Sequence, residues 1–272
     1  MLTVEPHRMD ICEGERVLDV GCGPGRHSWA VCKRHNCYVH AIDIDSDSVR
    51  RARWMFQELE KQGETKGEWR VLKGSGMCLP FKEGSFDRVI CSEVLEHVDD
   101  EQQVVGELRR VLKDNGVLAV SVPTSYTERI FWKIGKNYSH PGGHIRIFKA
   151  QDIVDLLTRN NMHIYEVTHK HSLHSIYWFF RCLFGLDNES AFAPRMYLKF
   201  LHWGMRTRNK AYRFLENAFD HIWPKSIVLY TWKVNAQPSP FDFDSDSQQA
   251  PQDTHFFTEK VEYVPPQESL SE

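Results

Sequence analysis

The chain of 272 residues is 41% hydrophobic and 26% charged, so it can bury the core of one domain with additions. Its formal net charge of -3 gives no overall attraction to nucleic acid. The seven cysteines are odd in number and contain no C-x-x-C, so they indicate neither a disulfide framework nor a zinc ribbon. Because no apolar run is long enough to span a bilayer, the composition predicts a cytoplasmic protein.

Strands alternate with helices along most of the chain. We expect strands near residues 16–20, 38–42, 69–72, 87–92, 117–122, 163–168 and 226–234. We expect helices near residues 26–35, 48–61, 101–113 and 150–159, the third of them ended by Asn115-Gly116 as a left-handed cap. This alternation predicts a doubly wound α/β fold, in which helices cover both faces of a Rossmann-like, seven-stranded and mostly parallel sheet.

The segment VLDVGCGPG at residues 17–25 is the first that points to a ligand. Gly21, Gly23 and Gly25 form a turn between a strand and a helix, where the backbone can approach a ligand closely. The spacing is G-x-G-x-G, whereas dinucleotide sites have G-x-G-x-x-G. Asp19 beside this turn would repel a pyrophosphate but attract an ammonium or sulfonium group. The alternative is a glycine turn that closes an ordinary loop.

Three acids follow the second predicted strand. Asp43 lies about twenty residues past the glycines, where an acid meets ribose hydroxyls in nucleotide-binding folds. We therefore assign Asp43 to ribose binding. Asp45 and Asp47 are expected to cap the helix that starts near residue 48 and to interact with its dipole.

With these motifs the chain resembles the class I S-adenosylmethionine-dependent methyltransferases, in particular the branch of the ubiquinone and menaquinone methyltransferases. Four blocks carry the resemblance in the family's order over roughly residues 14–170: VLDVGCGPG, AIDID, LPFKEGSFDRVICSEVLEHV and LRRVLKDNGVLAVSVP. They are specific for fold and cofactor and carry no information about the substrate. The resemblance implies S-adenosyl-L-methionine as the cofactor and an antiparallel last strand.

The resemblance also implies which residues bind the cofactor. Asp19 and the three glycines would hold its methionine end, and Asp43 its ribose. The full set that we assign to cofactor binding is Asp19, Gly21, Cys22, Gly23, Gly25, Asp43, Ile44, Ser75, Gly76, Met77, Ser92 and Glu93.

Adenine recognition departs from the family's pattern. The family usually has Gly-Asp before the LPF segment, with the Asp reaching the adenine amino group, whereas this chain has Gly74-Ser75-Gly76. The Ser75 hydroxyl is a neutral and weaker partner, and Met77 and Cys78 would contribute through their backbone or packing. The segment 79–81 would either cover the adenine face or pack in the core.

Two regions lie outside the alternating strands and helices. The second of them is an acidic, disordered tail at 236–272, so we divide the chain into a methyltransferase domain at 1–235 and this tail. Within the domain, residues 172–225 form an insertion too long for a hairpin loop, rich in Phe, Tyr and Trp, with more bases than acids. We expect helices there that cover the substrate, together with the loop 124–148. The alternative is that these helices only cover the sheet edge with their aromatic side chains inward.

Four residues are candidates for a general base. His97 follows the fourth strand at the sheet's carboxyl end, where ligands bind in such folds. Tyr138, His140 and His144 lie in a glycine-containing loop of the type that closes over a substrate. A hydrogen-bonded structural histidine is the alternative for each imidazole.

Histidines near the sixth strand raise the question of a metal site. Strand alternation would put His169 and His171 on one face, and His163 and His174 lie nearby. No neighbouring set of Cys or carboxylate residues completes a site, so the sequence predicts no metal.

We therefore predict an S-adenosylmethionine-dependent methyltransferase that methylates O or C of a small, hydrophobic or lipid-like acceptor. The aromatic, basic insertion also suits peripheral contact with a membrane. The alternatives are an RNA methyltransferase that uses this insertion, which the weak overall charge does not favour, and a cofactor-binding scaffold without turnover. The sequence leaves the oligomeric state open.

Overall fold

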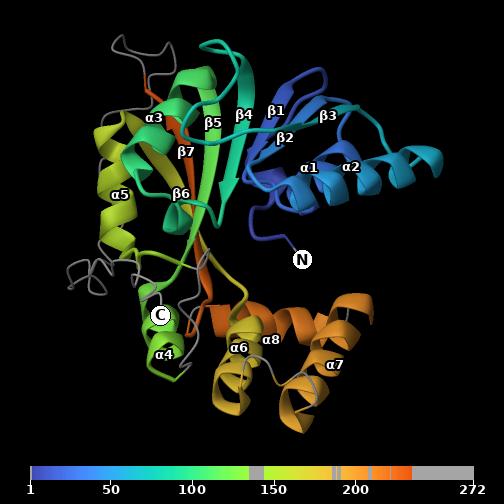
Figure 1. Cartoon of the computed structure of the whole chain (residues 1–272), viewed down its shortest axis with the longest axis vertical. Helices are drawn as coiled ribbons and strands as arrows, with labels where there is room; N and C mark the ends of the chain where they lie inside the picture. The colour runs from blue at the N-terminus through green and yellow to red at the C-terminus, as the bar shows by residue number, and fades with distance from the viewer. Residues whose placement is uncertain are drawn as a thin grey trace, which may run out of the picture.

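Seven strands form one sheet, whose order fixes where a ligand can bind (Figure 1). The order is β3-β2-β1-β4-β5-β7-β6, with β7 antiparallel to β5 and β6 and the other neighbours parallel. The strands are β1 Arg16–Val20, β2 Tyr38–Asp43, β3 Glu68–Lys73, β4 Phe86–Ser92, β5 Leu112–Pro123, β6 Met162–Lys170 and β7 Ser226–Lys233. The strand order reverses at β1 and β4, which leaves a crevice at their carboxyl ends. The predicted fold class is confirmed.

The computed structural model describes residues 2–134, 144–185, 188, 191–207, 210–220 and 222–234. The α-helices there are α1 Arg26–Cys32, α2 Ser46–Lys61, α3 Glu101–Val111, α4 Ser125–Ile134, α5 Ala150–Arg159, α6 Ser172–Phe184, α7 Phe192–Thr207 and α8 Lys210–Asp220. None of the described helices has the length and apolar character needed to cross a membrane. The predicted acidic tail lies outside the described residues.

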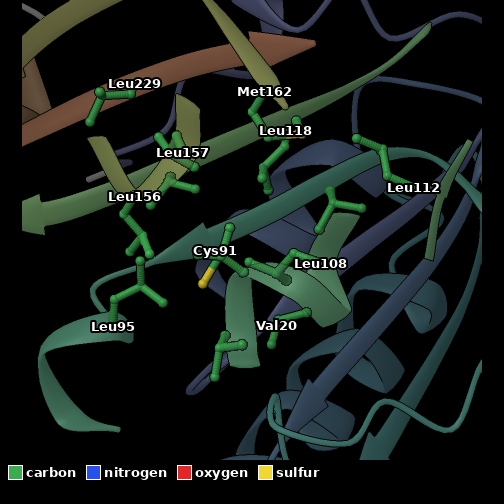
Figure 2. Close-up of a cluster of buried hydrophobic side chains, with 14 of the residues drawn as sticks. Val20, Cys91, Leu95, Leu108, Leu112, Leu118, Leu156, Leu157, Met162 and Leu229 are labelled. Atoms are coloured by element: carbon green, nitrogen blue, oxygen red, sulfur yellow. The ribbon is translucent and has the colours of Figure 1, made fainter. Parts of the chain in front are cut away.

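Alternating side chains of the central strands feed two cores, one on each face of the sheet. Leu18 and Val20 of β1 join the core covered by α3 and α5, whereas Val17 joins the core covered by α1 and α2. Figure 2 shows the first core, with strand residues packed against helix residues such as Leu108 and Leu156. Strands buried on both faces appear in the sequence as continuous apolar runs, which is why most of them could be predicted closely.

The link between α3 and β5 differs from the prediction. The helix ends at Val111 rather than near residue 113, because Leu112 is extended, fully buried and paired with Phe86 of β4. Asn115 does adopt the left-handed conformation, with φ 61°, but inside β5. The β4–β5 register shifts there, so Asn115 accommodates an irregularity in the strand and does not cap the helix.

Part of the predicted loop 124–148 is a helix. Residues Ser125–Ile134 form α4, and Thr124 shares a hydrogen bond with Thr127 at its start. The serine followed three residues later by Glu128 is a helix-start pattern that the prediction passed over. This helix carries Glu128 to the end of the sheet where β5 ends (Figure 1).

The insertion forms three helices, α6, α7 and α8, beside α4 at that end of the sheet (Figure 1). A small core of Leu173, Leu201 and Tyr212 joins them. Many other apolar side chains of the insertion stay exposed, with Phe192 at 79% and Phe214 at 73%. The insertion is therefore more than a cover with its aromatic side chains turned inward.

Candidate functional site

The glycine turn leaves β1 and enters α1 with a backbone that only glycine adopts easily. Gly21, Gly23 and Gly25 all have positive φ, at 66°, 53° and 89°. A Cβ on Gly21 would overlap Cγ2 of Val94, whereas a Cβ on Gly23 would meet nothing within 4 Å. Gly21 is thus needed for packing, and Gly23 keeps space open above the turn.

Asp19 lies beneath this turn and is almost fully buried. One of its carboxylate oxygens, Oδ2, accepts hydrogen bonds from the backbone N of Ser28, at 3.1 Å, and from the Ser28 hydroxyl in the first turn of α1. The other, Oδ1, has no hydrogen-bond partner among the residues that the structure describes. Burial raises the pKa of Asp19 to about 6. An ammonium group would give Oδ1 a partner, so the site fits the methionine end of the cofactor, and this role stays a prediction.

Asp43 ties the turn to the end of β2. Its Oδ2 accepts a hydrogen bond from Gly23 N at 2.7 Å, and its Oδ1 accepts one from Asp45 N at 2.8 Å. Each carboxylate oxygen has a second lone pair that a ribose hydroxyl could use. Cys22 N donates to Ile42 O at 3.1 Å, and Ile44 beside Asp43 is 68% exposed. These contacts bring the predicted ribose residue next to the predicted glycine turn.

The predicted adenine segment lies beside β1. A Cβ on Gly76 would come within 3.1 Å of Val20 Cγ1, and the Ser75 hydroxyl accepts a hydrogen bond from Met77 N at 3.2 Å. Leu79 is buried in the core, and Phe81 packs against it. Core packing therefore accounts for the apolar members of the segment 79–81, and the adenine role of Ser75 stays a prediction.

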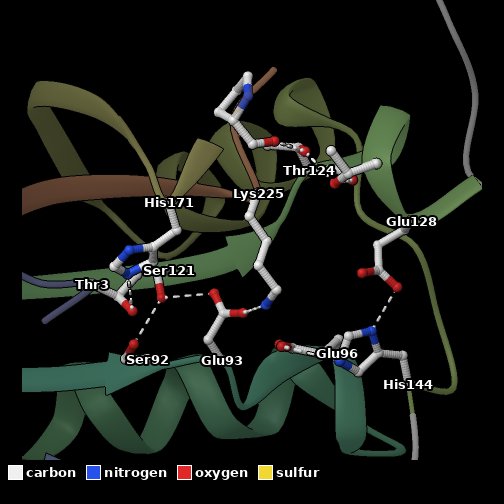
Figure 3. A network of polar contacts seen from close by, with 12 residues as sticks. Thr3, Ser92, Glu93, Glu96, Ser121, Thr124, Glu128, His144, His171 and Lys225 are labelled. Carbon is white, nitrogen blue, oxygen red and sulfur yellow. Dashed lines mark hydrogen bonds and ion pairs between the residues drawn. The ribbon is translucent and has the colours of Figure 1, made fainter. Parts of the chain in front are cut away.

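Two predicted cofactor residues end β4 at the crevice (Figure 3). The Ser92 and Ser121 hydroxyls are 2.9 Å apart, and Ser121 also donates to Glu93 at 3.2 Å. Glu93 has φ 57° and forms an ion pair with Lys225 at 3.6 Å. Glu93 is thus held by residues of β5 and of the segment that precedes β7.

A carboxylate–imidazole pair stands at the same place (Figure 3). His144 Nδ1 lies 2.7 Å from Oε2 of Glu128, which is 1% exposed. The segment around His144 is fixed because Ile145 N donates to Glu96 O at 2.9 Å. The His97 ring lies 4.8 Å from the His144 ring, centroid to centroid. The structure thus brings two predicted bases together, whereas Tyr138 and His140 lie outside the described residues.

Glu96 completes this group. It is 1% exposed, and its Oε1 lies 4.0 Å from His144 Nε2. Burial, followed by the charge of Glu93, raises the pKa of Glu96 well above its usual range. Glu96, His97 and His144 offer ligand atoms within 4.8 Å of one another, so they could also hold a metal ion. The sequence prediction named neither Glu96 nor Glu128, although Glu96 directly precedes His97.

Comparisons with known proteins agree with this architecture. Residues 18–120 match the family described as a methyltransferase domain. The chain is 29% identical over 114 residues to the O-methyltransferase rstn1 of Aspergillus nomiae, a match that covers 42% of this chain and 49% of that protein. It is 34% identical over 114 residues to the sterol 24-C-methyltransferase ERG6B of Gibberella zeae, covering 42% of this chain and 29% of that protein. These matches span less than half the length of either relative.

The fold is similar to that of a crystal structure described as SAM-dependent methyltransferases from Methanosarcina mazei. The TM-score is 0.55 at 19% identity, and the alignment covers 86% of this chain and 99% of that one. At this identity the likeness concerns the fold.

The glycine turn can be tested with two matched substitutions. We expect Gly23→Ala to weaken binding of S-adenosylhomocysteine at least tenfold, because its methyl group would enter the open space above the turn. An alanine in the left-handed conformation at residue 23 would lower the free energy of unfolding by only about 1–2 kcal/mol. Gly21→Ala should lose more stability because of the overlap with Val94. Calorimetry and urea denaturation measure both quantities, and unchanged affinity in Gly23→Ala would contradict the assignment.

Asp19 should make stability depend on pH. Because its folded-state pKa is raised from 3.8 to about 6, its contribution is fully present below pH 4 and is lost as pH rises through 6. Relative to Asp19→Asn, the wild-type free energy of unfolding should therefore fall by about 2 kcal/mol between pH 4 and pH 7. Urea denaturation across this range measures the difference, and parallel pH profiles would rule out the buried, titrating carboxyl.

The fold and the local sequence thus lead to the same class of protein. The strand order places the glycine turn at the crevice, and the hydrogen bond from Gly23 N to Asp43 joins the two predicted halves of the cofactor site. The family match covers the strands that carry both groups. Residues 18–120 therefore match a methyltransferase domain, and the sheet that carries them has the fold of the Methanosarcina mazei structure.

Proposed function

We propose that the protein transfers the methyl group of S-adenosylmethionine to O or C of a hydrophobic, lipid-like acceptor, and that His144 takes up the proton that the acceptor loses. The observation that carries this proposal is the 2.7 Å contact between His144 and the buried Glu128 at the carboxyl end of the sheet. A general base is needed when the attacking atom arrives protonated, as a hydroxyl or an activated C–H does.

The geometry assigns a task to each group. Bound S-adenosylmethionine supplies an activated methyl group, so the protein has mainly to align the acceptor and remove one proton. The Glu128 carboxylate faces Nδ1 of His144 and orients the imidazole, and we assign uptake of the proton to Nε2. Oε1 of Glu96 lies 4.0 Å from Nε2, and the raised pKa of Glu96 favours its neutral acid, which does not compete as a charged partner.

The insertion supports a hydrophobic acceptor. Along α7, Phe192, Met196, Phe200 and Trp203 follow helical spacing on one face, and each is at least 36% exposed. Exposed bases at residues 195, 199 and 206 lie on the adjoining face. A helix with an apolar stripe flanked by bases suits the surface of an anionic membrane. We propose that α7 contacts such a surface, from which a lipid-like acceptor could reach the crevice beside α4 and α6.

The name of one relative agrees with an acceptor of this kind, because it specifies a sterol. One is an O-methyltransferase and another a sterol 24-C-methyltransferase. By analogy, we propose that this chain also takes an acceptor with a large apolar body. The name of the first relative specifies O as the methylated atom, and that of the second specifies C.

Labelled cofactor tests the acceptor class. The protein is incubated with methyl-labelled S-adenosylmethionine and separate extracts of lipids in anionic vesicles, polar small molecules and RNA. We expect label in the lipid fraction. Label in RNA that falls steeply with salt would support an RNA methyltransferase instead. Cofactor binding without label in any fraction would support a scaffold, and both outcomes contradict the proposal.

The base is tested by His144→Ala and Glu128→Gln. Loss of a general base typically lowers turnover by about 10²–10⁴-fold, and we expect His144→Ala to fall in that range. Glu128→Gln should have a smaller effect in the same direction, because it removes the charge that orients His144. Binding of S-adenosylhomocysteine should change little in either variant, and the exposed His7→Ala serves as the control. Full turnover in His144→Ala would exclude it as the base.

A further inference from the structure

A second group of imidazole and carboxylate side chains lies where the insertion meets the sheet. His171, His174 and Glu216 each offer one ligand atom, and these atoms lie within 4.8 Å of one another. His171 is 7% exposed, and the other two residues are partly buried. Because β6 ends at Lys170, the predicted strand-face pair of His169 and His171 is not formed. The fold instead adds the carboxylate that the neighbouring sequence lacks.

The local structure holds these residues in place. His171 is the N-cap of α6 with φ 68°, and His174 lies three residues further on the same helical turn. Glu216 comes from α8, which is fixed against that turn by Ser172: its N donates to Asp220 Oδ1 at 2.8 Å, and its hydroxyl donates to Glu216 O at 3.3 Å. A non-glycine residue in left-handed conformation is costly, and such residues persist where surrounding contacts fix them.

Both imidazoles have a nitrogen to offer. Nδ1 of His171 and Nδ1 of His174 are buried and have no hydrogen-bond partner within the described part of the chain. Burial lowers the pKa of His174 to about 4 and that of His171 well below its usual range. A neutral imidazole is the form of histidine that binds a metal.

His171 also has an outer partner that fixes its ring (Figure 3). Its Nε2 lies 3.0 Å from the Thr3 hydroxyl, which accepts a hydrogen bond from Arg26 at 3.0 Å. If Nε2–H donates to Thr3, the lone pair is left on Nδ1. Histidine ligands of metals commonly donate their other ring N–H in this way.

We propose that His171, His174 and Glu216 bind one divalent transition-metal ion, of which zinc is the best match. Two neutral imidazoles and one carboxylate are a typical three-ligand set for zinc, with water at the fourth position, whereas magnesium and calcium prefer oxygen ligands. Of the cations near the two imidazoles, Lys225 pairs with Glu93 and Arg26 donates to Thr3. The ion would link the start of α6 to α8 and, through Thr3, to the N-terminal segment.

Metal binding tests this site without any measurement of methyl transfer. The full chain, without a histidine tag and stripped with EDTA, is titrated with Zn²⁺ by calorimetry, and Co²⁺ is added separately to follow its visible absorption. The double variant H171A/H174A should bind one equivalent of Zn²⁺ fewer than the wild type and lose the corresponding cobalt band. Glu216→Gln should bind at least tenfold more weakly. The exposed His163→Ala should bind as the wild type does.

Two further measurements keep the result unambiguous. Zn²⁺ should raise the melting temperature of the wild type by several degrees more than that of Glu216→Gln, the variant to rely on if H171A/H174A does not fold. The variant His144→Ala removes a ligand from the other possible metal site, formed by Glu96, His97 and His144. It should still bind the equivalent of Zn²⁺ that we assign to His171, His174 and Glu216. No Zn²⁺ uptake at micromolar concentration, or uptake unchanged in both H171A/H174A and Glu216→Gln, would overturn the proposal.

Discussion

Two backbone amides, Gly23 N and Asp45 N, donate to the two oxygens of the Asp43 carboxylate, and the rest of the site is arranged around this contact. One amide belongs to the turn after β1 and the other to the start of α2, so a single side chain joins the ends of two neighbouring strands. Hydrogen bonds to a charged group contribute about 1.5–3 kcal/mol each. Glycine residues can adopt many backbone conformations, and these hydrogen bonds are strong enough to hold the turn in one of them.

Buried carboxyl groups and imidazoles lie around the contact between Asp43 and the glycine turn. Asp19 is buried beneath the turn, while Glu96 and Glu128 are buried across the crevice beside the histidines. Buried carboxyls are costly when ionised, and at Asp19 and Glu96 burial raises the pKa. The crevice thus pairs the proposed base, His144, with a neighbouring carboxyl that favours its neutral form. Such a combination suits uptake of a proton from a bound acceptor.

The sequence predicted those parts of the molecule that depend on short-range patterns. Apolar runs located the strands, the glycine turn located the crevice, and Asp45 does cap α2, with its carboxylate accepting from Ser48 N at 2.8 Å. Partners distant along the chain could not be found in this way. Glu128 contacts His144 from a helix that the prediction treated as loop, and Glu216 lies near His174 only because α8 folds back on α6. Neither pairing leaves a periodic pattern in the sequence, because each pairing is created by tertiary contacts alone.

The position of β7 has a consequence for how the chain folds. This strand occupies the gap between β5 and β6, yet it follows both of them and all three helices of the insertion in the sequence. Until residue 226 is available, β5 and β6 each present an unpaired edge, which is the feature that promotes aggregation of incomplete sheets. The insertion is therefore synthesised while the sheet is still open.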